Sequence, residues 1–206
     1  MREEAQRIAG RLEGTLRIPD APATAIVVIA HPLPTHGGTM RNPLMASLAR
    51  AVAERGWYAL RFNFRGVGDS AGEWSGGLAE SADLIDAVDH ARNIAPGLPL
   101  GVIGFSFGAV TVLRWITSGG HPDAYALLGL PMRAVTQTSS ELPPVPSGSL
   151  IVNGERDEFG TAQELRAKYP EAEVIEIKGA DHYFTGQRDD LTRLVIDRLS
   201  EQLRLR

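Results

Sequence analysis

The stretch that decides the fold is Pro99-Leu100-Gly101-Val102-Ile103-Gly104-Phe105-Ser106-Phe107-Gly108-Ala109-Val110. It predicts a buried strand that runs directly into a helix, with a serine at the corner between them. Gly104, Ser106 and Gly108 fit the pattern G-x-S-x-G, in which the serine sits on a sharp strand-to-helix turn. A turn this tight crowds the positions two residues before and after the serine, so residues without a Cβ atom relieve the clash.

This corner has a chemical and a purely structural interpretation. In the chemical one, the turn pushes the Ser106 hydroxyl outward and leaves backbone N–H groups at the start of the helix free to face an anion. In the structural one, the glycines only let a strand and a helix pack closely. A pattern this short can match by chance, so the rest of the chain has to decide between the two interpretations.

The composition is that of an ordinary globular protein. The chain has 206 residues, of which 43% are hydrophobic and 22% are charged, so we expect one domain over residues 1–206.

The formal net charge is -4 and no basic run stands out, which argues against nucleic acid as a partner. Cysteine is absent, which excludes disulfides, a thiolate nucleophile and cysteine metal sites. No apolar run has the length of a signal peptide or a membrane span, so we expect a soluble, cytoplasmic protein without a membrane partner.

Strands and helices alternate along the chain. Residues 1–11 are polar and uninformative. Residues 12–18 alternate as an outer strand would, and 25–30 form a β-branched run typical of a strand buried on both faces. Further strands are predicted over 57–62, 124–130, 149–153 and 173–177, and helices over 43–55, 106–117, 161–170 and 191–203. This alternation predicts an α/β fold, with a mostly parallel sheet that has helices on both faces.

Three helices carry more specific signals. Asn42 before Pro43 predicts a helix start, and Thr161 with Glu164 predicts a capping box. In the helix that precedes the quoted stretch, the predicted buried face is Leu84, Ile85, Val88 and Ala91, and the predicted polar face is Asp83, Asp86 and Asp89.

The loops after two later strands supply partners for the serine. In open parallel sheets, binding sites gather beyond the carboxyl ends of the strands. Asp157 follows the strand at 149–153, and His182 follows the strand at 173–177. The chain order Ser106, Asp157, His182 is the order expected for serine hydrolases with this type of corner. Because each residue lies within a few positions of a strand end, all three can reach one region, which favours the chemical interpretation.

The acid has competitors nearby in the sequence. Glu155 and Glu158 lie beside Asp157, but Asp157 follows its strand end by the usual few residues. Asp181 is adjacent to His182, which points the two side chains apart and makes Asp181 a poor partner. Asp157 is therefore the predicted acid.

Four further histidines were weighed against His182. His90 and His121 are predicted on the surface. His31 and His36 border the proposed site, but no carboxylate or third histidine shares their spacing, so we expect them to pack within the loop and not to hold a metal.

At this point the chain resembles the α/β-hydrolase family over nearly its full length, and it looks most like the small, lidless, dienelactone-hydrolase-like esterases. The motifs that carry the resemblance are His31-Pro32…Gly37-Gly38-Thr39-Met40, Phe62-Asn63-Phe64-Arg65-Gly66-Val67-Gly68-Asp69-Ser70 and Gly104-Phe105-Ser106-Phe107-Gly108. Dienelactone hydrolases use a cysteine nucleophile, which this chain lacks, so that specific activity is not expected. The resemblance implies a three-layer α/β-hydrolase fold. Residues 131–148 are too few for the cap domain that many relatives carry, so no cap is expected.

The implied mechanism is acyl transfer without a cofactor. A serine hydroxyl needs a base within hydrogen-bond reach, which His182 would provide, and Asp157 would hold the imidazole tautomer. The oxyanion needs two donors, of which one is the backbone N–H of Phe107, directly after the nucleophile. The second is expected in the loop after the strand at 25–30, where the neighbouring prolines lack an N–H, so that Leu33 is the first usable donor with Thr35 behind it.

The expected substrates are small, short-chain acyl esters. The predicted pocket is lined by Leu33, Phe105, Phe107, Met132, Tyr183 and Phe184, with His36 as a further substrate contact. An open apolar groove buries little of a long chain, which favours short ones. Two alternatives stay open: an amide, thioester or peptide hydrolase with the same triad, and a non-catalytic binding module on a hydrolase scaffold. The expected state is a monomer or a homodimer.

Overall fold

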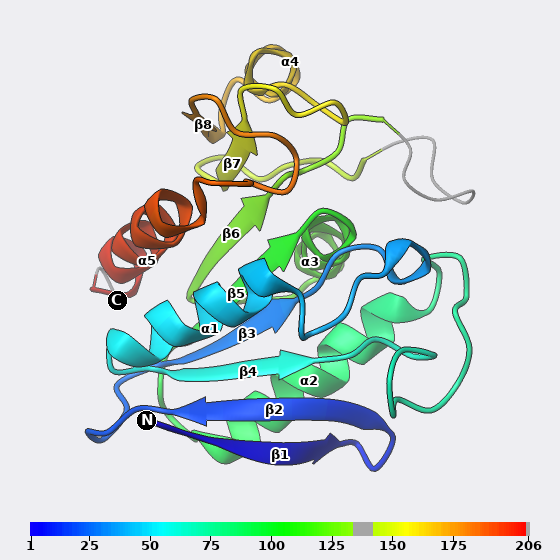
Figure 1. Cartoon of the computed structure of the whole chain (residues 1–206), viewed down its shortest axis with the longest axis vertical. Helices are drawn as coiled ribbons and strands as arrows, with labels where there is room; N and C mark the ends of the chain where they lie inside the picture. The colour runs from blue at the N-terminus through cyan, green and yellow to red at the C-terminus, as the bar shows by residue number, and fades with distance from the viewer. Residues whose placement is uncertain (134–141, 205–206) are drawn as a thin grey trace.

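The strands form one eight-stranded mixed sheet with helices on both sides (Figure 1). This computed structural model describes residues 1–133 and 142–204. The strands are β1 (Arg2–Ile8), β2 (Leu12–Ile18), β3 (Ile26–Ala30), β4 (Tyr58–Phe62), β5 (Leu100–Phe105), β6 (Ala124–Leu128), β7 (Leu150–Gly154) and β8 (Glu173–Ile177). The helices are α1 (Pro43–Glu54), α2 (Glu80–Ile94), α3 (Phe107–Thr117), α4 (Ala162–Lys168) and α5 (Arg188–Arg204), with a short 3-10 turn η1 (Pro34–His36).

The order of the strands places the predicted site loops at one edge. The sheet runs β1-β2-β4-β3-β5-β6-β7-β8, and the pairings from β4 through β8 are parallel, while β1 and β2 are antiparallel. In register, Val28 of the central strand β3 lies opposite Leu60 on one side and Val102 on the other. The loops that follow β3, β5, β7 and β8 therefore leave the sheet at the same edge, as sites in open α/β sheets require.

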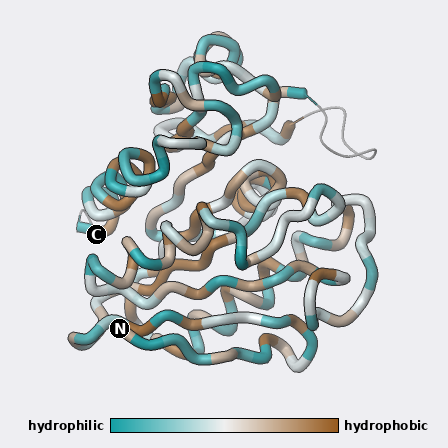
Figure 2. The backbone as a smooth tube through the Cα atoms, in the orientation of Figure 1, coloured by the Kyte–Doolittle hydropathy of each residue, from teal (hydrophilic) through white to brown (hydrophobic). Residues whose placement is uncertain are grey.

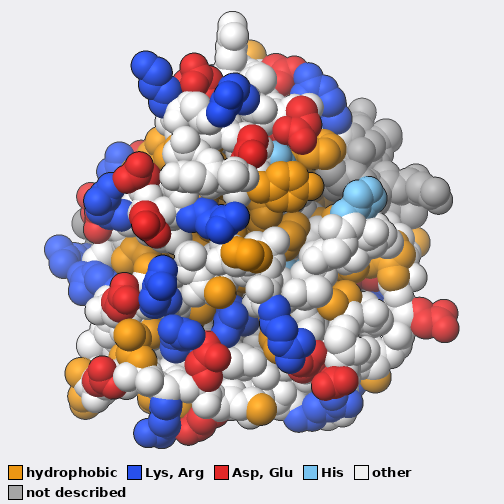
Figure 3. All heavy atoms as spheres, viewed as in Figure 1, with side chains coloured by type: hydrophobic (Ala, Val, Ile, Leu, Met, Phe, Trp, Pro, Cys, Tyr) orange, Lys and Arg blue, Asp and Glu red, His pale blue; other side chains and the backbone are white. Residues whose placement is uncertain are grey.

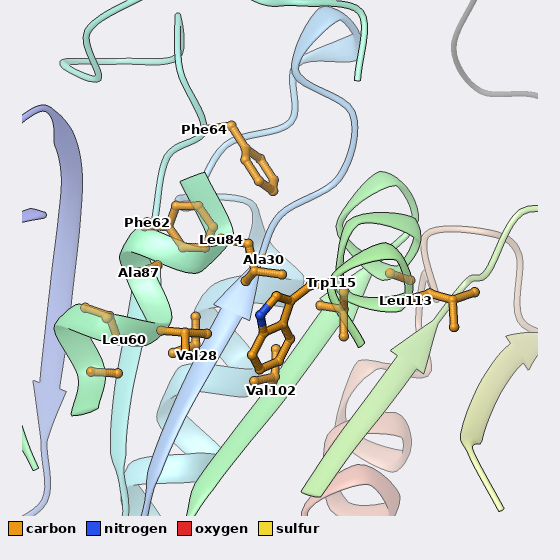
Figure 4. Packing of buried hydrophobic residues seen from close by; sticks show 14 of the residues in the cluster. Val28, Ala30, Leu60, Phe62, Phe64, Leu84, Ala87, Val102, Leu113 and Trp115 are labelled. Carbon is orange, nitrogen blue, oxygen red and sulfur yellow. The ribbon is translucent and has the colours of Figure 1, made fainter. Parts of the chain in front are cut away.

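Both faces of the sheet are buried by helices. Alternate residues of β3 belong to different clusters, because successive side chains on a strand point to opposite faces. Val28 packs in a cluster with residues of α2 and α3, whereas Val27 and Ile29 pack with residues of α1 and α5. Figure 4 shows the first cluster, with Leu84 of α2 and Trp115 of α3 over the sheet. The uninterrupted β-branched run at 25–30 has this double burial as its cause.

Hydropathy follows the same layering. The apolar backbone segments concentrate in the central strands, and the polar ones in β1 and on the outer helices (Figure 2). On the face shown in Figure 3, positive and negative side chains are interspersed. No helix within residues 1–133 and 142–204 is long and apolar enough to cross a membrane.

The predicted helix starts are confirmed. Asn42 accepts a hydrogen bond from the backbone N–H of Leu44 at 2.9 Å, with Pro43 at the first helical position of α1. Thr161 and Glu164 form both bonds of the capping box that opens α4. These signals are local, so the sequence alone carries them.

Residues 1–11, which are uninformative as a sequence, contain a strand. β1 spans Arg2–Ile8 and pairs with β2 along its whole length. Its side chains are exposed except toward the end, where Ile8 is buried, so the strand has no apolar alternation to reveal it. Charged residues on a solvent-exposed edge strand also discourage pairing with another chain.

The predicted faces of α2 were wrong at two positions. Asp83 is fully buried, and Ile85, which was placed on the buried face, is 43% exposed. The Asp83 carboxylate binds the guanidinium groups of Arg11 and Arg65 at 2.7 Å. Because these partners come from the turn between β1 and β2 and from the loop after β4, the periodicity of α2 itself could not reveal that Asp83 faces inward. His90, predicted on the surface, is half-buried and hydrogen-bonds Gln6 at 3.1 Å.

Candidate active site

Ser106 occupies a strained corner between β5 and α3. Its φ and ψ are 53° and -114°, a conformation rare for residues other than glycine. The two flanking glycines are required by close backbone approaches, because a Cβ atom on Gly104 would lie 2.4 Å from the carbonyl oxygen of Gly108. A Cβ atom on Gly108 would lie 2.2 Å from the carbonyl oxygen of Ala30. The steric reason predicted for both glycines is confirmed, and Gly108 also brings the start of α3 against the end of β3.

The three predicted polar residues form one hydrogen-bonded chain. His182 Nε2 lies 3.0 Å from Ser106 Oγ, and His182 Nδ1 lies 2.9 Å from Asp157 Oδ2. All three residues are buried, with exposed fractions of 4% for Ser106, 3% for His182 and 1% for Asp157. An ionised carboxylate only accepts, so Nδ1 donates to Asp157 and Nε2 is left to accept from the serine hydroxyl. This is the arrangement of a serine hydrolase triad.

Asp157 is held by its own loop, and its competitors are engaged elsewhere. Its Oδ1 accepts from the N–H of Phe159 at 2.9 Å, and Asn153 Nδ2 lies 3.3 Å from Oδ2. Glu155 accepts from the N–H of Gly179, Asp181 accepts from the N–H groups of Tyr183 and Thr185, and Glu158 is exposed. These neighbours stabilise the two loops, whereas Asp157 is the carboxylate bonded to His182.

Aromatic rings fix the plane of the His182 imidazole. Its centroid lies 4.6 Å from that of Phe159, 5.3 Å from that of Phe105 and 5.3 Å from that of Tyr183. Contacts from several sides leave the ring little freedom, so its orientation is set before a substrate arrives.

The loop after β3 lies against the start of α3. The carbonyl of Leu33 accepts from the N–H groups of His36 and Gly38 at 3.1 and 3.0 Å, and a Cβ atom on Gly38 would lie 2.1 Å from the carbonyl oxygen of Pro32. Across the described parts of the chain, 1–133 and 142–204, the N–H groups of Leu33 and Phe107 have no acceptor. Both amides that the sequence singled out are thus available to a ligand.

Comparison with known proteins agrees with this geometry. Residues 23–194 match the alpha/beta hydrolase domain family. The chain belongs to this family. Among solved structures, the chain is similar to XC6422 from Xanthomonas campestris, a member of a/b serine hydrolase without lid, at 27% identity and a TM-score of 0.84, covering 98% of this chain and 95% of that one. Because a lidless protein covers nearly the whole chain, the predicted α/β-hydrolase fold without a cap domain is confirmed.

The chain is also similar to two further proteins. An alpha-beta serine hydrolase homologue from Coxiella burnetii has 28% identity and a TM-score of 0.83, covering 96% of this chain and 97% of that one. An uncharacterized protein of Rickettsia prowazekii, RP471, is 26% identical over 201 residues, which are 92% of this chain and 84% of that protein. The family is thus shown, and the relatives leave the substrate open.

A cavity of about 260 Å³ opens beside Ser106. Its lining residues are Pro32, Leu33, His36, Gly37, Gly38, Asn42, Ser106, Phe159, His182 and Tyr183. Figure 3 shows hydrophobic side chains gathered on this face of the molecule, between the loop after β8 and the loop after β3. The cavity therefore joins an apolar wall to a polar rim next to the triad.

The structure brings only part of the predicted lining to this cavity. Leu33, His36 and Tyr183 line it, as expected. Phe105 and Phe184 are fully buried beneath the triad, with ring centroids 6.1 Å apart.

Two more of the predicted lining residues lie away from the cavity. The Phe107 side chain is fully buried and packs on Phe64 and Trp74. The half-buried Met132 donates its backbone N–H to the carbonyl of Phe159, behind the wall. The three phenylalanine side chains are buried in the core, because large apolar side chains beside a buried corner fill the core first, and Met132 is not among the residues that line the cavity.

Five lining residues were not assigned to the site from the sequence: Pro32, Gly37, Gly38, Asn42 and Phe159. Phe159 lies two residues after Asp157, so the predicted acid loop itself could have pointed to it. Asn42 was recognised only as a helix cap, although its amide also faces the cavity rim.

The other histidines do not form a metal site within residues 1–133 and 142–204, where no group of three or more His, Asp or Glu side chains is placed to hold an ion. His31 is fully buried, with Nδ1 2.7 Å from the carbonyl oxygen of Pro32 and Nε2 3.1 Å from the N–H of Phe64. Burial lowers the pKa of His31 to about 4. His31 packs within its loop, as predicted. His36 is exposed and contacts Thr35 at 3.1 Å.

Proposed function

We propose that the protein is a serine hydrolase that cleaves small carboxylic esters through an acyl-enzyme on Ser106. The observation that carries the proposal is the hydrogen-bonded chain from Asp157 through His182 to Ser106 at the wall of a cavity. In this proposal Ser106 Oγ attacks the ester carbonyl carbon, and its proton passes to His182 Nε2. The tetrahedral intermediate collapses with loss of the alcohol, which takes the proton back from His182.

The oxyanion of the intermediate would be held by two backbone amides. The N–H groups of Phe107 and Leu33 lack acceptors within the described residues, and the contact of Gly108 with the carbonyl oxygens of Ala30 and His31 keeps their two segments together. Preorganised donors of this kind are worth about 10²–10³-fold each in kcat. A water molecule, activated by His182 in the same way, would then release the acid and restore Ser106.

The cavity favours a short, uncharged acyl group. Its volume of about 260 Å³ lies below the ~300–1,000 Å³ typical of sites for drug-sized ligands. Within the described residues, its lining contains no lysine or arginine that would pair with a carboxylate or phosphate. We expect kcat/KM for p-nitrophenyl esters to be greatest for acetate or butyrate and to fall for the longer chains. A clear optimum at decanoate or palmitate would contradict this substrate class.

The test of the catalytic proposal is covalent labelling. A fluorophosphonate probe should attach once per chain at Ser106, detected by intact mass and by peptide mapping. Ser106→Ala should abolish labelling, and His182→Ala should slow it strongly because the base is lost. Absence of labelling in well-folded wild-type protein would favour the non-catalytic binding module. If labelling occurs, parallel rates on matched ester, thioester and amide substrates distinguish the reaction classes.

A further inference from the structure

We propose that His31 is a positioning residue for the oxyanion hole: it holds the Pro32–Leu33 peptide so that the N–H of Leu33 faces the substrate. This proposal rests on the proposed function, and it assigns work to a buried histidine that the acyl-transfer mechanism does not otherwise use. His31 is not among the residues that line the cavity and has no hydrogen bond to Ser106; it acts through the backbone of Pro32, which does line the cavity.

The hydrogen bonds of His31 fix its tautomer. The backbone N–H of Phe64 can only donate, so Nε2, at 3.1 Å, must be the acceptor. Nδ1 therefore carries the proton and donates to the carbonyl oxygen of Pro32 at 2.7 Å. The ring also meets the Phe64 ring edge-on, with centroids 4.8 Å apart. Both ring nitrogens of His31 are thus hydrogen-bonded to backbone groups, and the ring packs against Phe64.

The bond to the Pro32 carbonyl sets the direction of the Leu33 amide. A peptide unit is planar and trans, so its N–H points opposite to its C=O. There are no cis peptide bonds in the described residues. The Pro32 oxygen is enclosed by His31 on one side and by the Cα of Gly38 on another, because Gly38 leaves no room for a Cβ atom. The Leu33 N–H is directed away from these groups and has no acceptor within residues 1–133 and 142–204.

The far end of the same loop is held by the same strand. Asn63 Oδ1 accepts from the N–H of Met40 at 2.8 Å, and Arg61 donates to the carbonyl of Met40 at 3.2 Å. Arg61, Asn63 and Phe64 all lie at the end of β4 or directly after it. The loop from His31 to Met40 is therefore hydrogen-bonded at both ends to residues at the end of β4 or directly after it. Of these contacts, the one made by His31 lies nearest to Leu33 in the sequence.

Two nearly isosteric substitutions separate the two bonds of His31. In His31→Asn, the amide nitrogen stands near the place of Nδ1, so the donor to Pro32 is retained and the acceptor for Phe64 is lost. In His31→Gln, the longer amide reaches the place of Nε2, so the acceptor is retained and the donor is lost. We expect kcat for p-nitrophenyl acetate to fall about 10–100-fold in His31→Gln and less than about fivefold in His31→Asn, with KM little changed in both, because an oxyanion donor acts mainly in the transition state.

A second pair of variants tests whether His31 acts through Leu33. Leu33 has φ of -54°, which proline adopts, so Leu33→Pro removes the N–H with little change of backbone, and Leu33→Ala is the control that keeps the N–H. Leu33→Pro should lower kcat about 10²–10³-fold relative to Leu33→Ala. In the Leu33→Pro background, His31→Gln should cause no further loss of kcat, since the group that His31 orients is already absent.

The readouts separate this proposal from the proposed function and from a purely structural role. Wild-type protein that neither hydrolyses the ester nor reacts with a fluorophosphonate would refute the proposed function itself. With active wild-type protein, equal losses of kcat in His31→Asn and His31→Gln, or additive losses in the Leu33→Pro background, would overturn the role of His31. Inhibition by an alkyl trifluoromethyl ketone, whose serine adduct carries an oxyanion, should weaken in parallel with kcat.

A second variant is needed if His31→Gln fails to fold. Gly38→Ala displaces the same Pro32 carbonyl, and folded Gly38→Ala with unchanged kcat would also overturn the proposal.

Discussion

Two buried histidines lie in loops on either side of β5, the strand that leads to Ser106, and the groups around them differ completely. His31 follows β3 on one side of β5, and His182 follows β8 at the far end of the other side. His182 faces the carboxylate of Asp157 with one nitrogen and the Ser106 hydroxyl with the other. His31 meets only backbone groups with its two nitrogens, and its burial lowers its pKa to about 4. In the proposed mechanism the same side chain would carry a proton in one loop, and in the proposed positioning role it would stay neutral and hold the backbone in the other.

The two histidines differ in their hydrogen-bond partners and not in their burial. Both rings are nearly inaccessible, with exposed fractions of 0% for His31 and 3% for His182. Around His31, the hydrogen bond to the Pro32 carbonyl only partly offsets the lowering of its pKa by burial. This contrast makes quantitative predictions for the two loops.

The largest expected effect is the loss of the base. His182→Ala should lower kcat for p-nitrophenyl acetate by about 10⁴-fold or more, because Ser106 then lacks a proton acceptor. In the other loop, His31→Asn should lower kcat by less than about fivefold, because the asparagine amide keeps the hydrogen bond to Pro32. Initial rates normalised to folded protein measure both. Comparable losses in the two variants would erase the distinction between proton carrier and positioning residue.

The next effect concerns the acid. Asp157→Asn should lower kcat by about 10³–10⁴-fold, since an amide no longer enforces the His182 tautomer or stabilises the imidazolium. Glu158→Gln, an exposed neighbour in the same loop, is the control and should stay within about twofold of wild type. A large loss in Glu158→Gln together with an active Asp157→Asn would move the acid to Glu158.

A smaller expected effect is the contribution of His31 to the pH dependence of the free energy of unfolding. Its pKa is lowered from 6.5 to about 4 by burial, so the unfolded chain binds the proton more readily than the folded one. The contribution of neutral His31 to stability is complete above about pH 6.5 and is lost as the pH falls toward about 4, by about 3 kcal/mol in total.

Urea unfolding at pH 7.5 and pH 4.5 measures this contribution. Wild type should lose about 2–3 kcal/mol more than His31→Asn between these two pH values. Identical losses in both proteins would show that His31 is not kept neutral by the fold.

The smallest effect belongs to the exposed histidine of the same loop. His36 lines the cavity rim but bonds only to Thr35. His36→Gln should change KM by less than about fivefold and leave kcat unchanged, because exposed contacts contribute little binding energy. A kcat loss as large as that of His31→Gln would mean that His36, and not the buried His31, supports the oxyanion loop.

Much of this site was readable from the sequence because its signals are local. The spacing of Gly104, Ser106 and Gly108 reports a steric requirement of the backbone, and the glycine contacts confirm that requirement. Asp157 and His182 each follow a strand end, and parallel strands bring such ends to one edge. Helix starts at Asn42 and Thr161 were equally plain, since a cap involves neighbouring residues only.

The errors arose where long-range contacts decide the outcome. Asp83 is buried because two arginines from other segments bind it, and β1 is a strand because β2 pairs with it. The division between pocket and core was equally hidden. Phe105 and Phe184 are as apolar as Phe159, yet they lie beneath the triad while Phe159 lines the cavity.

The sequence by itself determined the fold class, the elbow and the order of the triad residues, because each is encoded in backbone sterics or in the regular alternation of strands and helices. Only the tertiary structure decided which aromatic rings face the cavity and what His31 does. A side chain's work depends on the groups packed around it: the imidazole of His31 met two backbone groups, that of His182 met a carboxylate and a hydroxyl, and no local pattern distinguishes the two.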